Sequence, residues 1–150
     1  MSCSTILILT NNPNANHENE RYPAYFSECI SIAAVSKKKG FPVAVFSNSN
    51  KEVDYAGIGV SVDSFSPGGG FKKMSGTSMA CPHACGLVAC LIQKYSGTQN
   101  LRKKMSEMHT IDIASEGVDN ATGVGFLTYL TPGEFDQFLP RKAMTAATTE

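Results

Sequence analysis

Ten residues decide how this sequence is interpreted: Met74-Ser75-Gly76-Thr77-Ser78-Met79-Ala80-Cys81-Pro82-His83. They follow a glycine-rich loop at residues 66–70 and lead into a sustained helical pattern. Apolar side chains recur there at steps of three and four residues, which predicts a helix that ends near Gly97. The repeat consists of Ala84, Leu87, Val88, Leu91, Ile92 and Tyr95. Small apolar residues also occupy its opposite side, so we expect a buried helix.

A serine at the start of such a helix has two interpretations. Ser78 could be an ordinary N-cap, whose hydroxyl accepts a hydrogen bond from a free backbone N–H. It could instead be a nucleophile, because a helix N-terminus favours the negative charge that develops when serine attacks a carbonyl. The position of Ser78 alone favours the N-cap.

The wider motif favours the nucleophile. The segment Gly76-Thr77-Ser78-Met79-Ala80, followed by Pro82, His83 and Gly86, resembles the serine motif G-T-S-M-A-x-P-H of the subtilases, a family of serine proteases. The resemblance implies that Ser78 is the acylating nucleophile. It also implies that His83 helps to shape the site and is not the catalytic base. The residues that support the motif are Gly76, Thr77, Met79, Ala80, Pro82 and His83.

A second match lies upstream. Residues 5–10 (TILILT) form a short apolar run typical of a buried strand. Asn12 follows this run and precedes Ser78 by 78 − 12 = 66 residues. Subtilases carry an asparagine at the end of such a strand, and its side chain stabilises the oxyanion. The resemblance implies this role for Asn12, although an asparagine here is by itself also an ordinary turn residue.

The remaining elements are predicted from local patterns. Strands are expected at residues 29–35, 43–46, 58–62 and 123–130, and a short helix at residues 101–108. Thr131-Pro132-Gly133-Glu134 has the pattern of a helix start, with Thr131 as the N-cap.

The resemblance covers nearly the whole sequence. We therefore assign residues 1–139 to part of a subtilase catalytic domain and residues 140–150 to a C-terminal tail. It implies an α/β fold: a doubly wound, mostly parallel sheet with a buried central helix, present here as its C-terminal half. The absent strands would leave a sheet edge and one side of the helix exposed.

The catalytic aspartate and histidine of the subtilases have no counterpart here. The family order is Asp, His, Ser, yet none of the eleven residues before Asn12 is Asp or His. His17 follows Asn12, and using it as the base would demand a new geometry. We expect a partial serine endopeptidase, nearly inactive alone, that acts on a peptide or protein substrate. An N-terminal-half chain could supply the missing pair. The alternative is a non-catalytic binding or regulatory module derived from a subtilase.

Composition argues against several other functions. Thirteen basic residues balance thirteen acidic ones, so nothing favours nucleic acid or an anionic membrane. No apolar run approaches the roughly 18 residues of a membrane span. The first residues lack the pattern of a signal peptide, and secretion is implied only by the resemblance. Gly68-Gly69-Gly70 lacks the spacing of a phosphate-binding loop.

The five cysteines cannot all pair within one chain, because their number is odd. Cys81, Cys85 and Cys90 fall within the predicted helix. A metal site formed by cysteines and His83 is one alternative, and we favour small buried apolar residues. No cofactor is expected. Calcium is frequent in subtilases, but no ligand for it is assigned here.

Overall fold

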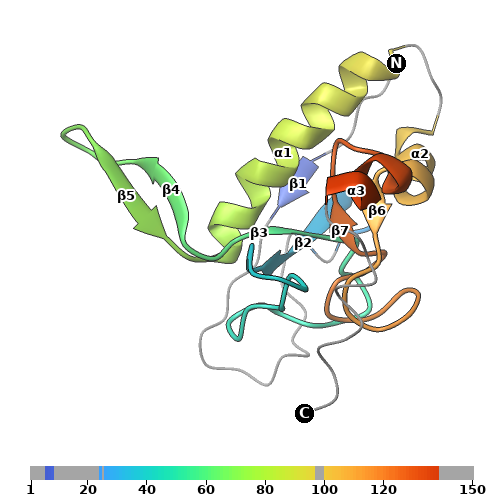
Figure 1. Ribbon diagram of the computed structural model, residues 1–150, viewed down its shortest axis with the longest axis horizontal. Helices are drawn as coiled ribbons and strands as arrows, with labels where there is room; N and C mark the ends of the chain where they lie inside the picture. The colour runs from blue at the N-terminus through green and yellow to red at the C-terminus, as the bar shows by residue number, and fades with distance from the viewer. Residues whose placement is uncertain (1–5, 9–23, 25, 97–99, 139–150) are drawn as a thin grey trace.

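A five-stranded, mostly parallel sheet forms the centre of the computed structural model (Figure 1). The structure describes residues 6–8, 24, 26–96 and 100–138. Across the sheet the order is β1 (Ile6–Ile8), β2 (Cys29–Val35), β3 (Tyr55–Ile58), β7 (Phe126–Leu127) and β6 (Thr110–Ile111). The first four strands pair in parallel, and β6 is antiparallel to β7. The expected α/β class is confirmed.

Strand β2 is buried along its whole length because both faces of the sheet are covered. Ile32 and Ala34 pack in a core with helices α1 (Thr77–Lys94) and α2 (Leu101–Met108). Ala33 and Val35 face the opposite core, which includes Phe135 of helix α3 (Pro132–Phe138). Successive side chains of a strand point to opposite faces, so a strand covered on both sides is a continuous apolar run. This is why residues 29–35 were predicted correctly.

Helix α1 is buried along one side only. Its buried residues are Thr77, Ala80, Cys81, Ala84, Val88 and Leu91. The other side, with Cys85, Ala89 and Cys90, is exposed, and Ile92 keeps 42% of its surface accessible. The expectation of a buried helix is therefore met on one face, and the apolar second face lies open. The helix ends at Lys94, before Gly97, which lies outside the described residues.

Two strand predictions are wrong. Residues 43–46 form no strand: Val43 makes an isolated bridge to Val35, and the chain then turns. The run looked like a strand because it is apolar, yet Val45 is 89% exposed. The strand expected at residues 58–62 is displaced, since β3 ends at Ile58.

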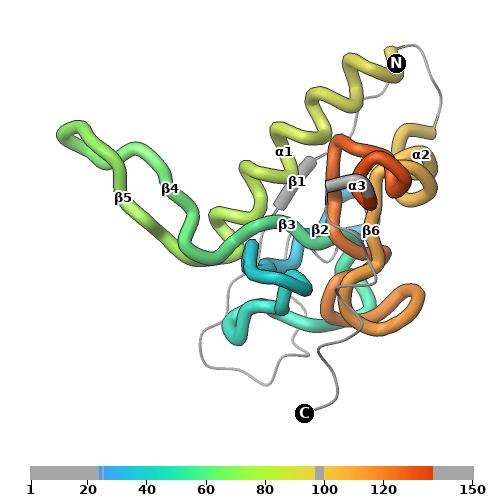
Figure 2. Tube along the Cα trace, in the orientation of Figure 1, coloured from blue at the N-terminus to red at the C-terminus, as the bar shows by residue number. Residues whose placement is uncertain are grey.

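A projecting hairpin takes up the chain after β3 (Figure 2). Strands β4 (Val62–Phe65) and β5 (Phe71–Met74) pair antiparallel, and the predicted loop at residues 66–70 is their turn. The three consecutive glycines of this turn all have positive φ angles, which glycine adopts at little cost. The rings of Phe65 and Phe71 are exposed and lie 4.9 Å apart.

Helix α2 has the predicted bounds. The strand expected over residues 123–130 is much shorter than predicted, because β7 contains only Phe126 and Leu127. At the start of α3, Thr131 N–H donates to Glu134 Oε2 at 2.8 Å, and Glu134 N–H donates back to Thr131 Oγ1 at 3.5 Å. This reciprocal pair is the predicted capping box.

The domain boundary predicted after residue 139 lies outside the described residues. None of the helices in the described part of the chain has the length and apolar character needed to cross a bilayer.

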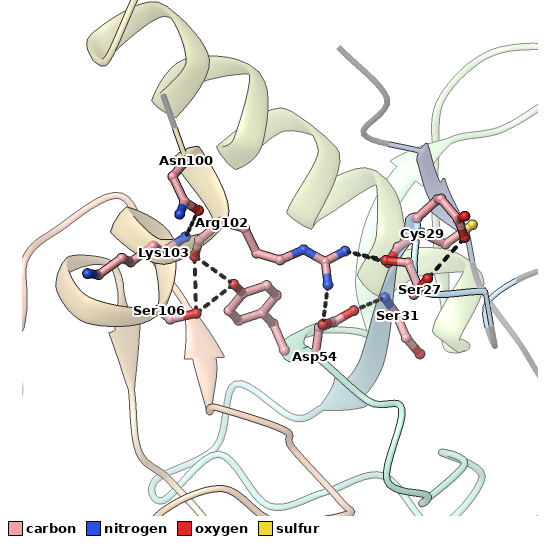
Figure 3. A network of polar contacts seen from close by, with 10 residues as sticks. Ser27, Cys29, Ser31, Asp54, Asn100, Arg102, Lys103 and Ser106 are labelled. Atoms are coloured by element: carbon pink, nitrogen blue, oxygen red, sulfur yellow. Dashed lines mark hydrogen bonds and ion pairs between the residues drawn. The ribbon is translucent and has the colours of Figure 1, made fainter. Parts of the chain in front are cut away.

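Arg102 joins α2 to the starts of β2 and β3 (Figure 3). Its guanidinium donates to Asp54 Oδ1 at 2.8 Å and to the Cys29 carbonyl at 2.6 Å. The second carboxylate oxygen of Asp54 accepts the Ser31 N–H at 2.8 Å. Burial raises the pKa of Asp54, although the Ser31 N–H and the charge of Arg102 act to lower it. The network closes the end of the sheet opposite to the start of α1.

Replacing Arg102 with alanine should lower the free energy of unfolding by about 2 kcal/mol, because a partly buried carboxylate loses its partner. The side chains of Arg102 and Asp54 are 43% and 24% exposed, so the loss stays below that of a fully buried pair. Urea denaturation measures this change. Lys103→Ala is the matched control, since its contact with Glu107 is exposed and contributes less than about 0.5 kcal/mol. Equal losses in both variants would contradict the role of Arg102.

Candidate active site

Ser78 lies in the first turn of α1, and its side chain is exposed. The N-cap of the helix is Gly76, so the interpretation of Ser78 as an ordinary N-cap is wrong. Thr77, the residue between them, is buried. The serine hydroxyl is therefore presented to solvent from a rigid element, as a nucleophile requires.

Gly57, within β3, and Gly59, directly after it, allow the start of α1 to approach the sheet. Gly76 N–H donates to the Gly59 carbonyl at 2.8 Å. A Cβ atom on Gly59 would lie 2.7 Å from Ala34 Cβ and 2.8 Å from the Gly76 carbonyl oxygen. A Cβ atom on Gly57 would lie 2.9 Å from the Ala80 carbonyl oxygen. Glycine is thus needed at both positions to place the start of α1 against the end of β3.

Ser75 holds the same turn from the hairpin side. Its Oγ accepts the backbone N–H of Ser61 at 2.9 Å. Ser61 has a φ of 53°, a left-handed conformation that is unfavourable for a residue other than glycine. Ser75 belongs to the serine motif, but no local pattern indicates this contact, because the two serines are 14 residues apart.

The first turn of α1 is suited to stabilise negative charge. The first N–H groups of an α-helix lack acceptors within the helix. Here the N–H groups of Met79 and Ala80 donate to the Gly76 carbonyl at 2.9 and 3.3 Å. The Ser78 N–H lies one residue earlier, in the part of the turn where the helix supplies no acceptor. No acidic residue lies in this turn. The turn therefore offers a backbone donor and the positive end of the helix dipole beside the Ser78 hydroxyl.

His83 faces a different direction from Ser78. It lies five residues further along α1, which turns it by about 140° around the helix axis. Its ring lies 6.1 Å from that of Phe126. Burial lowers the pKa of His83, which favours a neutral imidazole. This placement does not make His83 a base for Ser78, and its role in shaping the site stays a prediction.

His109, the other described histidine, directly follows α2 and contacts the C-terminal end of α1. Its Nε2 is 2.8 Å from the Tyr95 hydroxyl, and Tyr95 lies about 25 Å from Ser78 along the axis, at 1.5 Å per residue. Neither described histidine therefore reaches the nucleophile. Asn12 and His17 lie outside the described residues, so the structure does not test the oxyanion role of Asn12.

The predicted alternative of a metal site concerns residues in the described part of the chain. No group of three or more His, Cys, Asp or Glu side chains is placed there to hold an ion. The alternative of a site that combines the cysteines with His83 therefore finds no support among these residues.

Comparison with known proteins identifies the family. The model of the subtilase family, peptidase S8, matches residues 9–125. The chain belongs to the subtilase family. This confirms the resemblance seen in the serine motif and covers β2, β3, the hairpin and α1.

Curated relatives of this subtilase chain are named as proteases. It is 34% identical over 127 residues to the major intracellular serine protease of Bacillus subtilis, covering 78% of this chain and 37% of that protein. It is 29% identical over 147 residues to fervidolysin of Fervidobacterium pennivorans, covering 85% and 21%. The chain thus spans well under half the length of these relatives. Others include the minor extracellular protease Epr of Bacillus subtilis, so the names indicate no single location.

Solved structures confirm the fold. The crystal structure of fervidolysin, described as a keratinolytic enzyme related to subtilisin, superposes with a TM-score of 0.72 at 27% identity, covering 83% of this chain and 22% of that one. Sphericase gives a TM-score of 0.71 at 25% identity, covering 82% and 47%. The subtilisin-like, doubly wound architecture is therefore present over most of this chain.

Proposed function

We propose that this subtilase chain supplies the nucleophile and the oxyanion donors of a serine endopeptidase. The observation that carries the proposal is the position of Ser78, exposed in the first turn of α1 and free of the N-cap role. The contact between Gly59 and Gly76 holds this turn against the C-terminal end of β3. Ligand sites of open α/β sheets lie beyond the carboxyl ends of the strands.

The proposed reaction begins when Ser78 Oγ attacks the carbonyl carbon of a peptide bond and its proton passes to a general base. The oxyanion that forms accepts hydrogen bonds from the Ser78 backbone N–H and from the side-chain amide of Asn12. Strands β1, β2 and β3 run parallel to one another, so the C-terminal ends of β1 and β3 lie at the same end of the sheet. Collapse of the intermediate transfers the proton to the departing amine and leaves an ester on Ser78, which water then hydrolyses.

The base and its aspartate would come from a segment with the N-terminal half of the subtilase fold. The open side of α1 supports this part of the proposal, because Cys85, Ala89, Cys90 and Ile92 form an exposed apolar strip. In the described part of the sheet, β1 is also an edge strand. Exposed apolar surface and an unpaired edge are features that a neighbouring layer covers.

Labelling with a fluorophosphonate probe tests whether the nucleophile and the base lie on separate segments. The purified chain, shown to be folded by circular dichroism, should react no faster than its Ser78→Ala variant, because a serine without a base is a weak nucleophile. Labelling of the chain alone that disappears in Ser78→Ala would mean that a base lies within these 150 residues, with His17 as the candidate. That outcome would overturn the two-part site and leave Ser78 as the nucleophile.

A further inference from the structure

Cys81 and Cys85 form a pair of free thiols one turn apart on α1. Cys81 is 9% exposed, whereas Cys85 is exposed to solvent. Residues four apart lie one above the other on the same face of a helix. The two side chains are close enough to share a hydrogen bond between their thiols. The pair is therefore preformed and open to solvent through Cys85.

This spacing suits a metal ion. Two side chains four residues apart on one helix can bind the same ion, as two histidines do in metalloproteases. In a tetrahedral site with metal–sulfur bonds of about 2.3 Å, two sulfurs lie about 3.8 Å apart, which is the range of a contact between neighbouring thiols. Thiolate sulfur is a soft ligand and selects soft ions over magnesium or calcium.

We propose that Cys81 and Cys85 form a two-thiolate binding site for a soft, thiophilic metal ion. Binding forms two metal–sulfur bonds and releases two thiol protons to solvent, with no change in oxidation state. The described residues supply no cluster with a third ligand, so solvent molecules complete the coordination. In this chain the thiol of Cys85 faces solvent, so it is available to a metal ion together with the adjacent Cys81.

The site also lies on the side of α1 that carries Ser78. Cys81 and Cys85 follow Ser78 by three and seven residues, which places both within about 60° of it around the axis. A bound ion would therefore compete with the segment that supplies the base, and in this respect the inference rests on the proposed function. The metal site itself does not, because it is measured on this chain alone.

Cadmium is the first probe, since its bonds to thiolate give an ultraviolet absorption band that can be titrated. The reduced chain should bind one Cd²⁺ through this pair. Cys85→Ser should weaken binding by about 10²-fold or more, because the second bond to a chelated ion is intramolecular. Cys90→Ser is the matched control: Cys90 is also exposed on α1, but it lies five residues from Cys85. This variant should bind as the wild type does, and excess Mg²⁺ should not compete.

Phenylarsine oxide gives a second readout, because its trivalent arsenic joins two neighbouring thiols with loss of one water. One equivalent should remove two titratable thiols from the wild type and from Cys90→Ser, and should react far less with Cys85→Ser. Wild-type cadmium affinity in Cys85→Ser, or an equal loss in Cys90→Ser, would overturn the proposal. Since Cys85 and Cys90 are both exposed, neither variant should alter the fold.

Discussion

Mixing this chain with a subtilase segment that carries the catalytic histidine and aspartate should raise the rate of Ser78 acylation by about 10⁴- to 10⁶-fold. In subtilisin, removal of the histidine alone costs about 10⁶ in turnover, and restoring a base in the correct position should recover much of that factor. Imperfect packing between two separate chains sets the lower limit. The exposed strip on α1, which includes Ile92, provides the surface on which such a segment would pack.

In subtilases the aspartate and histidine precede the serine, so a suitable partner is a segment of a subtilase that ends before its oxyanion asparagine. The Bacillus subtilis intracellular protease, 34% identical to this chain where they match, is one source. Size-exclusion chromatography first shows whether the two polypeptides associate. Fluorophosphonate labelling and peptide hydrolysis are then measured on the complex. Two controls are needed: Ser78→Ala in this chain, and an alanine in place of the partner's catalytic histidine. A complex labelled equally with and without the Ser78 hydroxyl would refute the nucleophile role and favour a non-catalytic module.

Replacing Gly123 with alanine should destabilise the fold by about 4 kcal/mol, the range in which single substitutions point to a specific defect. Gly123 has a φ of 62°, and a left-handed alanine costs about 1–2 kcal/mol. The larger part comes from packing, because a Cβ atom there would overlap the backbone carbonyls of Val53 and Asp54. Relief of that overlap would break the hydrogen bond from Val124 N–H to the Asp54 carbonyl, now 2.9 Å.

Gly117 provides the matched control for this substitution. It also has a positive φ, of 85°, but a Cβ atom there would meet no other atom within 4 Å. Gly117→Ala should therefore cost only the conformational part, about 1–2 kcal/mol. Urea denaturation of the two variants separates backbone conformation from close packing. If the two losses lay within about 1 kcal/mol of each other, the close approach of Gly123 to the Val53 and Asp54 carbonyls would not be the main constraint.

The sequence by itself determined the features that depend on residues close together in the chain. The period of α1 and the bounds of α2 follow from short repeats, and the capping box at Thr131 uses residues three apart. Strand β2 was recognised because burial on both faces requires a continuous apolar run. The serine motif likewise placed Ser78 at the start of a helix.

Only the tertiary structure decided the contacts between distant residues. The hairpin of β4 and β5 was not predicted. It projects from the body, and its strand sequences VDSF and FKKM carry apolar residues only at their ends, without the alternation that predicts a strand. Residues 43–46 are apolar, but they turn away from the sheet after a single bridge. The placement of Ser78 depends on the approach of Gly59 to Gly76 and on the bond from Ser61 to Ser75. These contacts join segments 14 or more residues apart, and only packing of the folded chain brings them together.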